Sequence, residues 1–166
     1  MKRLISCLSF CLSVATVSLF PLHAHAHDDA TLDKMKAPHG GQIRMAGAYH
    51  FELVLNPKAT QDKDSNVAVY LSNHGDGKIA SAGVSGNIVL LSSKGKTTLA
   101  LTPAGDNQLS GTGKYQAEPG LKAVVSLSFP DKSTAQARFT PLANAANMSS
   151  TANSVPSMAM GHVHQH

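Results

Sequence analysis

The residues of this chain that could do chemistry are mostly histidines and methionines. The 166 residues include 9 His and 6 Met beside 14 Lys and Arg, so imidazole is unusually abundant. Neutral imidazole and thioether are soft to borderline ligands, and in the absence of thiolate they suit copper best among the common metals. Cu(I) takes Met and His, whereas Cu(II) takes His and backbone nitrogen. Zinc can use the same histidines, although a zinc site usually adds Cys or a carboxylate.

The strongest local pattern lies at the C-terminal end. Five donors occupy every second position of the last nine residues: Met158, Met160, His162, His164 and His166. In an extended chain they project to one side. The rest of the segment from residue 142 is rich in Ala, Asn, Ser and Thr and cannot bury enough apolar surface to fold alone. The pattern predicts a disordered tail over 142–166 that binds metal, whereas the competing interpretation is a His-rich end with no function.

Residues 1–26 have the layout of a secretory signal peptide. Lys2 and Arg3 precede an apolar run over 4–20, and Ala24 and Ala26 supply small residues before a cleavage site. A membrane anchor is the competing interpretation, but the apolar run is at the short limit for spanning a bilayer. The chain is therefore expected to reach the periplasm, with no membrane insertion after cleavage.

The expected cleavage creates a second candidate metal site. A cut after Ala26 leaves His27 first, and its amine and imidazole can chelate Cu(II). A cut after Ala24 would instead place His27 third, which permits a square-planar site that includes backbone nitrogens. Both cysteines, Cys7 and Cys11, fall within the signal, so the mature chain can form neither a disulfide nor a thiolate site.

The third candidate site lies in the middle of the chain. His50 and Glu52 share the face opposite Phe51 and Leu53, so both are expected to point outward. His39 precedes a Gly-Gly pair and could reach them, and Met45 lies on the intervening segment. His74 is expected in an exposed turn. The candidate ligands of this region are His39, His50, Glu52 and His74. Each taken singly also fits an exposed or hydrogen-bonded side chain.

Apolar alternation in the middle zone predicts an all-β fold. Strands are expected at 49–55, 67–71, 88–91, 97–101, 121–129 and 135–139, separated by Gly, Asn, Asp and Pro clusters, and helical periodicity is absent. This spacing favours an Ig-like antiparallel β-sandwich of about seven strands over 39–141. The polar segment 27–38 is expected to be a flexible arm.

Residues 67–140 run through a strand, an Asn-His-Gly-Asp-Gly-Lys turn, two strands around a Lys-Gly-Lys hairpin, a Pro-Ala-Gly-Asp-Asn turn and two strands after Pro-Gly. This order resembles the small YtkA-like Ig-like domains of bacterial envelope proteins, several of which are linked to copper handling. The stretch from Pro38-His39-Gly40-Gly41 to Tyr49-His50-Phe51-Glu52 also resembles the opening of periplasmic proteins and adaptor domains of heavy-metal efflux. The resemblance implies the fold and a connection with metals, but no individual ligands.

Enzyme and nucleic-acid functions find little support. The chain has no Gly-x-Ser-x-Gly, His-Glu-x-x-His or phosphate-binding Gly-Lys-Ser/Thr motif. The net charge of +4 is spread out, with no run of Lys or Arg to track phosphates. The favoured hypothesis is a periplasmic, non-catalytic protein that binds copper or another heavy metal and sequesters it or hands it to an efflux or copper-chaperone protein. The alternative is an interaction module of a metal-efflux or envelope assembly.

Overall fold

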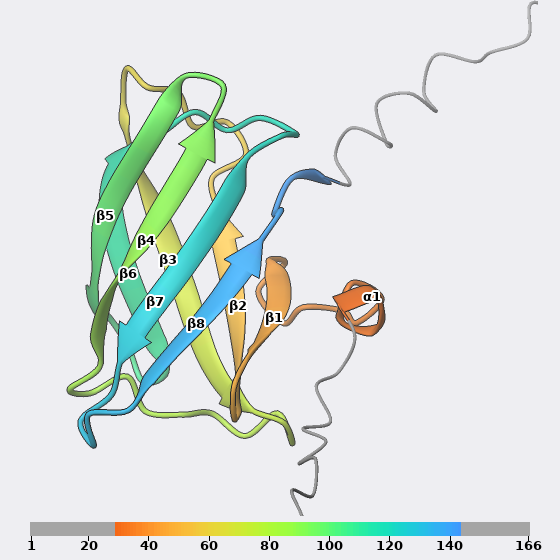
Figure 1. The fold of residues 1–166 in the computed structure, drawn as a ribbon, viewed down its shortest axis with the longest axis vertical. Coiled ribbons are helices and arrows are strands. Elements are labelled where there is room, and N and C mark those ends of the chain that lie inside the picture. Colours follow the sequence, from red (N-terminus) through yellow and green to blue (C-terminus); the bar gives the residue numbers. More distant parts are fainter. Residues whose placement is uncertain (1–28, 144–166) are drawn as a thin grey trace, which may run out of the picture.

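A computed structural model describes residues 29–143 of this protein (Figure 1). The predicted signal peptide, His27 and the five donors of the C-terminal tail lie outside these residues. No helix between residues 29 and 143 is long and apolar enough to cross a membrane.

One short helix, α1 (Asp29–Leu32), precedes eight strands. The strands are β1 (Gln42–Ala46), β2 (Tyr49–Leu55), β3 (Asp64–Asn73), β4 (Ser85–Ser92), β5 (Gly95–Pro103), β6 (Gln108–Lys114), β7 (Lys122–Ser128) and β8 (Thr134–Phe139). They form one antiparallel sheet in the order β1-β2-β3-β6-β5-β4-β7-β8. Because β1 also contacts β8, the sheet nearly closes into a barrel. The prediction of an all-β antiparallel fold is confirmed.

The sheet folds over between β5 and β6. β5 pairs with β4 along most of its length, but only Thr102 and Pro103 pair with β6. Strands β3 and β6 pair on one side of this fold, and strands β4 and β7 pair on the other. Two four-stranded halves therefore face each other and enclose the core (Figure 1).

The core is built from the alternate residues of each strand that point inward. Phe51, Val69, Leu71, Ile88 and Val125 are fully buried, as the apolar alternation predicts. The core also contains four of the eight aromatic side chains of the chain: Phe51, Tyr115, Phe129 and Phe139. Burial of this apolar area is the main term that stabilises the fold.

Two strands were missed by the sequence prediction, and each has a local reason. β1 interrupts its apolar pattern with Arg44, a charged residue that is only 6% exposed. β6 contains Gly111 and Gly113 in place of inward side chains. A Cβ on Gly111 would lie 2.5 Å from the carbonyl oxygen of Ala100, and one on Gly113 would overlap Leu99. The glycines thus let β5 approach β6 closely, but they also interrupt the alternation of apolar residues from which β6 could have been predicted.

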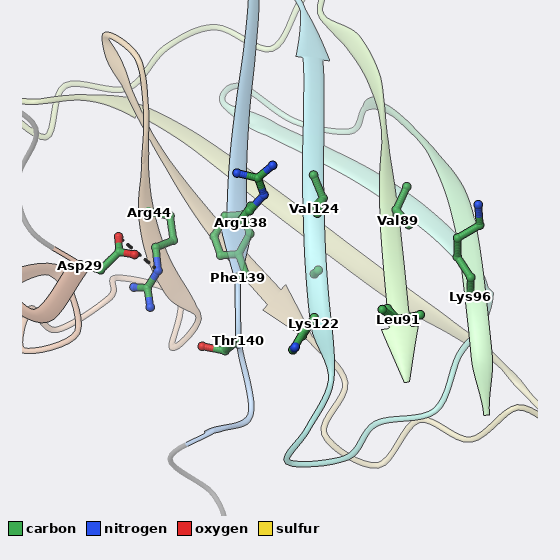
Figure 2. A pocket seen from close by; sticks show the side chains of 11 residues that line it. Asp29, Arg44, Val89, Leu91, Lys96, Lys122, Val124, Arg138, Phe139 and Thr140 are labelled. Carbon is green, nitrogen blue, oxygen red and sulfur yellow. Dashed lines mark ion pairs between the residues drawn. The ribbon is translucent and has the colours of Figure 1, made fainter. Parts of the chain in front are cut away.

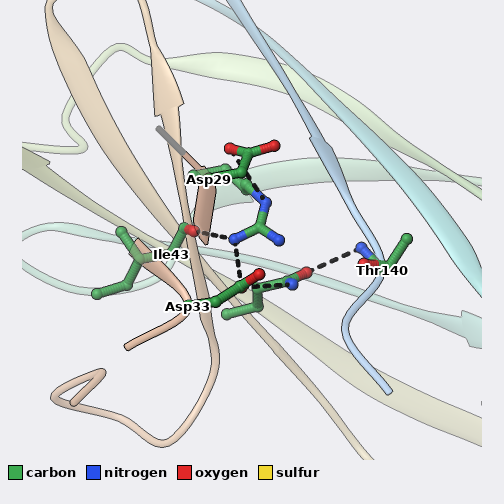
Figure 3. A network of polar contacts seen from close by, with 6 residues as sticks. Asp29, Asp33, Ile43 and Thr140 are labelled. Atoms are coloured by element: carbon green, nitrogen blue, oxygen red, sulfur yellow. Dashed lines mark hydrogen bonds and ion pairs between the residues drawn. The ribbon is translucent and has the colours of Figure 1, made fainter. Parts of the chain in front are cut away.

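The segment before β1 packs on the barrel, in contrast to the predicted flexible arm over 27–38. Leu32 is 2% exposed, and Asp33 receives a 2.7 Å hydrogen bond from Arg44 Nη1. Arg44 also donates to the carbonyl oxygen of Ile43 and lies 3.5 Å from Asp29 (Figure 3). The hydrogen bond from the guanidinium is the main cause that lowers the pKa of the Asp33 carboxyl.

Gln42 extends this network to the other edge of the sheet. Its amide donates to Asp33 and accepts from the backbone N–H of Thr140, which follows β8 (Figure 3). The polar contacts therefore hold the N-terminal segment, β1 and the end of β8 together where the barrel nearly closes.

Replacing Tyr115 with Phe is expected to lower the free energy of unfolding by about 2 kcal/mol at neutral pH. The Tyr115 ring is buried, and its hydroxyl donates to the carbonyl of Asn66 and accepts from the N–H of Asn56. Phe leaves both backbone groups without this partner. Urea denaturation of the two proteins measures the difference.

The same residue predicts a pH dependence. Burial raises the pKa of the Tyr115 hydroxyl above its ordinary value of 10.0. Its stabilising contribution is therefore complete below about pH 10 and is lost as the pH rises through the higher pKa of the folded state. The parent protein should lose more stability than Tyr115→Phe between pH 9 and pH 12, and equal losses would contradict this assignment.

Candidate functional site

The histidines of the folded body gather on the outer face of β2 and β3. A cavity of about 190 Å³ lies there, and its lining includes His39, His50, Glu52, Tyr70 and Asp76. His74 does not line the cavity, but its ring lies beside that of His50. Three of the four body residues predicted as metal ligands thus meet at one cavity, and the fourth adjoins it.

His50 and Glu52 point away from the core, as expected, but other segments cover both side chains. Both lie on the outer face of β2, opposite the core residues Phe51 and Leu53, but they are only 4% and 5% exposed. The loop before β1 covers Glu52, and His74 in the turn after β3 lies against His50. Strand periodicity gives the side of a sheet on which a residue lies, but not whether another segment covers that side.

Glu52 fixes the loop before β1 and orients His39. One carboxylate oxygen accepts hydrogen bonds from the backbone N–H groups of His39 (2.8 Å) and Gly41 (3.0 Å). The other lies 2.7 Å from Nδ1 of His39. The His39 ring also stacks on Tyr70, with centroids 3.6 Å apart and planes 3° from parallel. The Glu52 carboxylate therefore already serves three nitrogen donors.

This geometry gives Glu52 a role other than the expected one of metal ligand. When Nδ1 of a neutral His39 ring donates to the Glu52 carboxylate, Nε2 presents a lone pair. Histidines that bind metals usually have a carboxylate or carbonyl on the other ring nitrogen, which sets the tautomer and the ring direction. In this arrangement His39 is a candidate ligand and Glu52 its positioning residue.

His50 and His74 form the second pair. Their ring centroids are 4.9 Å apart and their planes are inclined by 30°. His50 lies within β2, whereas His74 is exposed in the turn that follows β3. Asn73 holds that turn, since its side-chain oxygen accepts from the N–H groups of Gly75 (2.9 Å) and Gly77 (2.8 Å). A Gly-rich turn with a bonded Asn thus brings an exposed imidazole to a buried one.

The body residues form two pairs instead of one shared cluster. Between residues 29 and 143, no group of three or more His, Cys, Asp or Glu side chains is arranged to hold a metal ion. Methionine belongs in this inventory as well, because thioether is a ligand for soft metals. Met45 lies directly opposite His50 in the β1–β2 ladder and is half-buried.

A second surface lies on the outer face of β4, β7 and β8, where a groove of about 440 Å³ is open to solvent (Figure 2). Its floor includes Val89, Val124 and Leu91, and Leu91 is 49% exposed. In the ladders, Leu91 stands opposite Lys96 on one side and Lys122 on the other. The sequence prediction did not identify this surface, because its residues come from five strands and from α1.

Charge around the groove is mostly positive. Lys96, Lys122 and Arg138 surround the apolar residues, and the lining includes one carboxylate, Asp29, which is paired with Arg44 (Figure 2). An apolar surface with a cationic rim is suited to a partner that is both apolar and acidic.

Comparisons of the chain with protein-family models, with curated proteins and with solved structures returned no match.

Proposed function

We propose that this protein is an exported, periplasmic copper-binding protein that sequesters the ion or hands it to a partner. The observation that supports this function best is the pair of imidazoles, His50 and His74, 4.9 Å apart on the outer face of the barrel. The ring of His39, oriented by Glu52, lines the same cavity, although within residues 29–143 it forms no group of three with His50 and His74 that could hold an ion. The signal-peptide pattern over 1–26 supports export.

Copper fits the donor set better than zinc does. Of the two carboxylates that line the cavity, Glu52 already accepts three hydrogen bonds, and the mature sequence offers no thiolate. Imidazole and thioether remain, and this combination favours copper. In this proposal the donors outside the described residues, His27 and the five of the C-terminal tail, capture copper and pass it on by ligand exchange. Such a role includes no catalytic step.

The strand order also suits the proposed family type. An Ig-like sandwich is built from Greek-key connections, in which strands distant in sequence become neighbours. The β3–β6 and β4–β7 pairings are of this kind. We therefore include an Ig-like domain, similar to the YtkA-like envelope proteins, in the proposal, with β1 as an additional edge strand.

Native mass spectrometry of the mature chain with Cu(I), Cu(II) and Zn(II) tests the function. The key variant is the full-length chain in which the tail donors are replaced (Met158 and Met160 to Leu; His162, His164 and His166 to Asn). This variant should retain copper. Adding His74→Asn to it should lower its copper affinity by about tenfold or more. His74 is exposed, so its replacement should leave thermal unfolding unchanged.

The other outcomes are equally informative. Copper held only when the tail is intact would place metal binding in the tail and remove the barrel from the proposed function. No copper on any form would contradict the metal function as a whole.

The second candidate function is an interaction module, and the groove between Lys96 and Arg138 favours it. An acidic, apolar segment of an envelope or efflux partner would fit this surface. Lys122→Glu should then abolish partner binding and leave copper binding unchanged. Replacement of the tail donors would have no effect on partner binding under this alternative.

A further inference from the structure

We propose that Met45 completes a three-coordinate Cu(I) site with His50 and His74. This inference rests on the proposed function, since it names the ligands and the oxidation state for the copper site of the barrel. It adds a soft sulfur donor to two imidazoles, and all three residues lie at the same end of the β1–β2–β3 surface.

Strand register brings Met45 to the pair. Met45 stands opposite His50 in the β1–β2 ladder, and residues directly opposite each other in an antiparallel pair share a face with Cβ atoms about 5 Å apart. His50 in turn stands opposite Ser72 in β3, two residues before His74. The unbranched, three-torsion side chain of Met45 is half-buried and can turn its sulfur toward His50.

The separation of the two rings argues for a bent site with a third ligand. An imidazole nitrogen about 2 Å from a metal places the ring centre about 3.1 Å from it. Two such rings in a linear arrangement would have centres about 6.2 Å apart, whereas an N–metal–N angle near 100–120° gives about 5 Å. The observed 4.9 Å is shorter than a linear arrangement requires and agrees with a bent one, in which a coordination position is left for a further donor.

The chemistry of the neighbours assigns that position to sulfur. Asp76 lines the adjoining cavity, but within residues 29–143 it forms no group of three with His50 and His74 that could hold an ion. Glu52 is committed to His39 and Gly41. A thioether remains, and thioethers select Cu(I) over Zn(II).

The test uses the full-length mature chain with the tail donors replaced as above and Met148 replaced by Leu, so that Met35 and Met45 are the sulfurs left. Cu(I) affinity is measured anaerobically by competition with bicinchoninate, and Zn(II) affinity by a separate chelator. Met45→Leu should lower Cu(I) affinity by about tenfold or more and change Zn(II) affinity by less than about twofold. X-ray absorption of the Cu(I) form should show one sulfur neighbour that disappears in this variant.

Met35→Leu is the matched control, because Met35 is also a methionine in the described region but is 40% exposed and lies before β1. It should change neither quantity. Thermal unfolding of Met45→Leu checks that the barrel is intact. If Met45→Leu leaves Cu(I) affinity and the sulfur signal unchanged while His74→Asn weakens copper, the role of Met45 is refuted and the proposed function stands. If His74→Asn is also without effect, the copper site of the barrel falls together with the role of Met45, and the proposed function as a whole is overturned only if no form of the chain binds copper.

Discussion

Glu52→Ala is expected to lower the free energy of unfolding by about 2 kcal/mol and to release His39 from its present position. The carboxylate is 5% exposed and accepts hydrogen bonds from two backbone N–H groups and from the His39 ring. Alanine removes the two oxygens that take part in these three hydrogen bonds and leaves a space beneath the loop. Urea denaturation at pH 7 gives the change in stability, and the ¹⁵N shifts of the His39 ring report its tautomer.

Glu52→Gln is the control that separates charge from hydrogen bonding. Its amide oxygen can still accept from the N–H groups of His39 and Gly41, but its NH₂ group would face Nδ1 of His39. The variant should lose only about 1 kcal/mol and should move the His39 proton to Nε2. A loss as large as that of Glu52→Ala, or an unchanged tautomer, would show that Glu52 does not position His39 as described.

Gly86→Ala is expected to destabilise the protein by about 3 kcal/mol. Gly86 lies in β4, which is paired on both sides, with Leu101 of β5 and Leu127 of β7. A Cβ at this position would overlap the carbonyl oxygen of Ser126 and the side chain of Leu127. Because the obstructing oxygen belongs to the backbone of a paired strand, relief requires the β4–β7 ladder to separate locally.

Gly105→Ala is the matched control for this substitution. A Cβ on Gly105 would meet only Gln108 atoms at 3.5 Å, which is ordinary van der Waals contact. Its effect should stay within about 0.5 kcal/mol. Chemical denaturation of both variants provides the comparison, and similar midpoints would mean that the barrel yields at Gly86 more easily than the backbone contact implies.

The two proposed binding sites lie on different surfaces of the barrel, so substitutions can test one site at a time. The histidines are on the outer face of β2 and β3, whereas the groove with Leu91 is on the outer face of β4 and β7. Substitutions in one surface therefore need not disturb the other. If both functions exist, a partner could dock on the groove and leave the copper donors accessible.

Several features of this protein follow from sequence alone. Alternation such as Phe51, Leu53 and Leu55 against His50 and Glu52 is a local property of extended chain, so it predicted strands and an antiparallel all-β fold. The same alternation placed His50 and Glu52 on one face. The abundance of His and Met and the absence of Cys after residue 11 are matters of composition, and the copper hypothesis is based on them.

Other features were decided by tertiary structure. The burial of His50 and Glu52 depends on a loop and a turn that cover the outer face, and the division of the histidines into His39 with Glu52 and His50 with His74 depends on register. Strands β1 and β6 were not predicted from the sequence. β1 contains the charged residue Arg44, whose burial depends on ion pairs, and β6 contains Gly111, where β5 approaches closely. These are contacts between residues distant in the chain, and the pattern of neighbours along one strand carries no information about them.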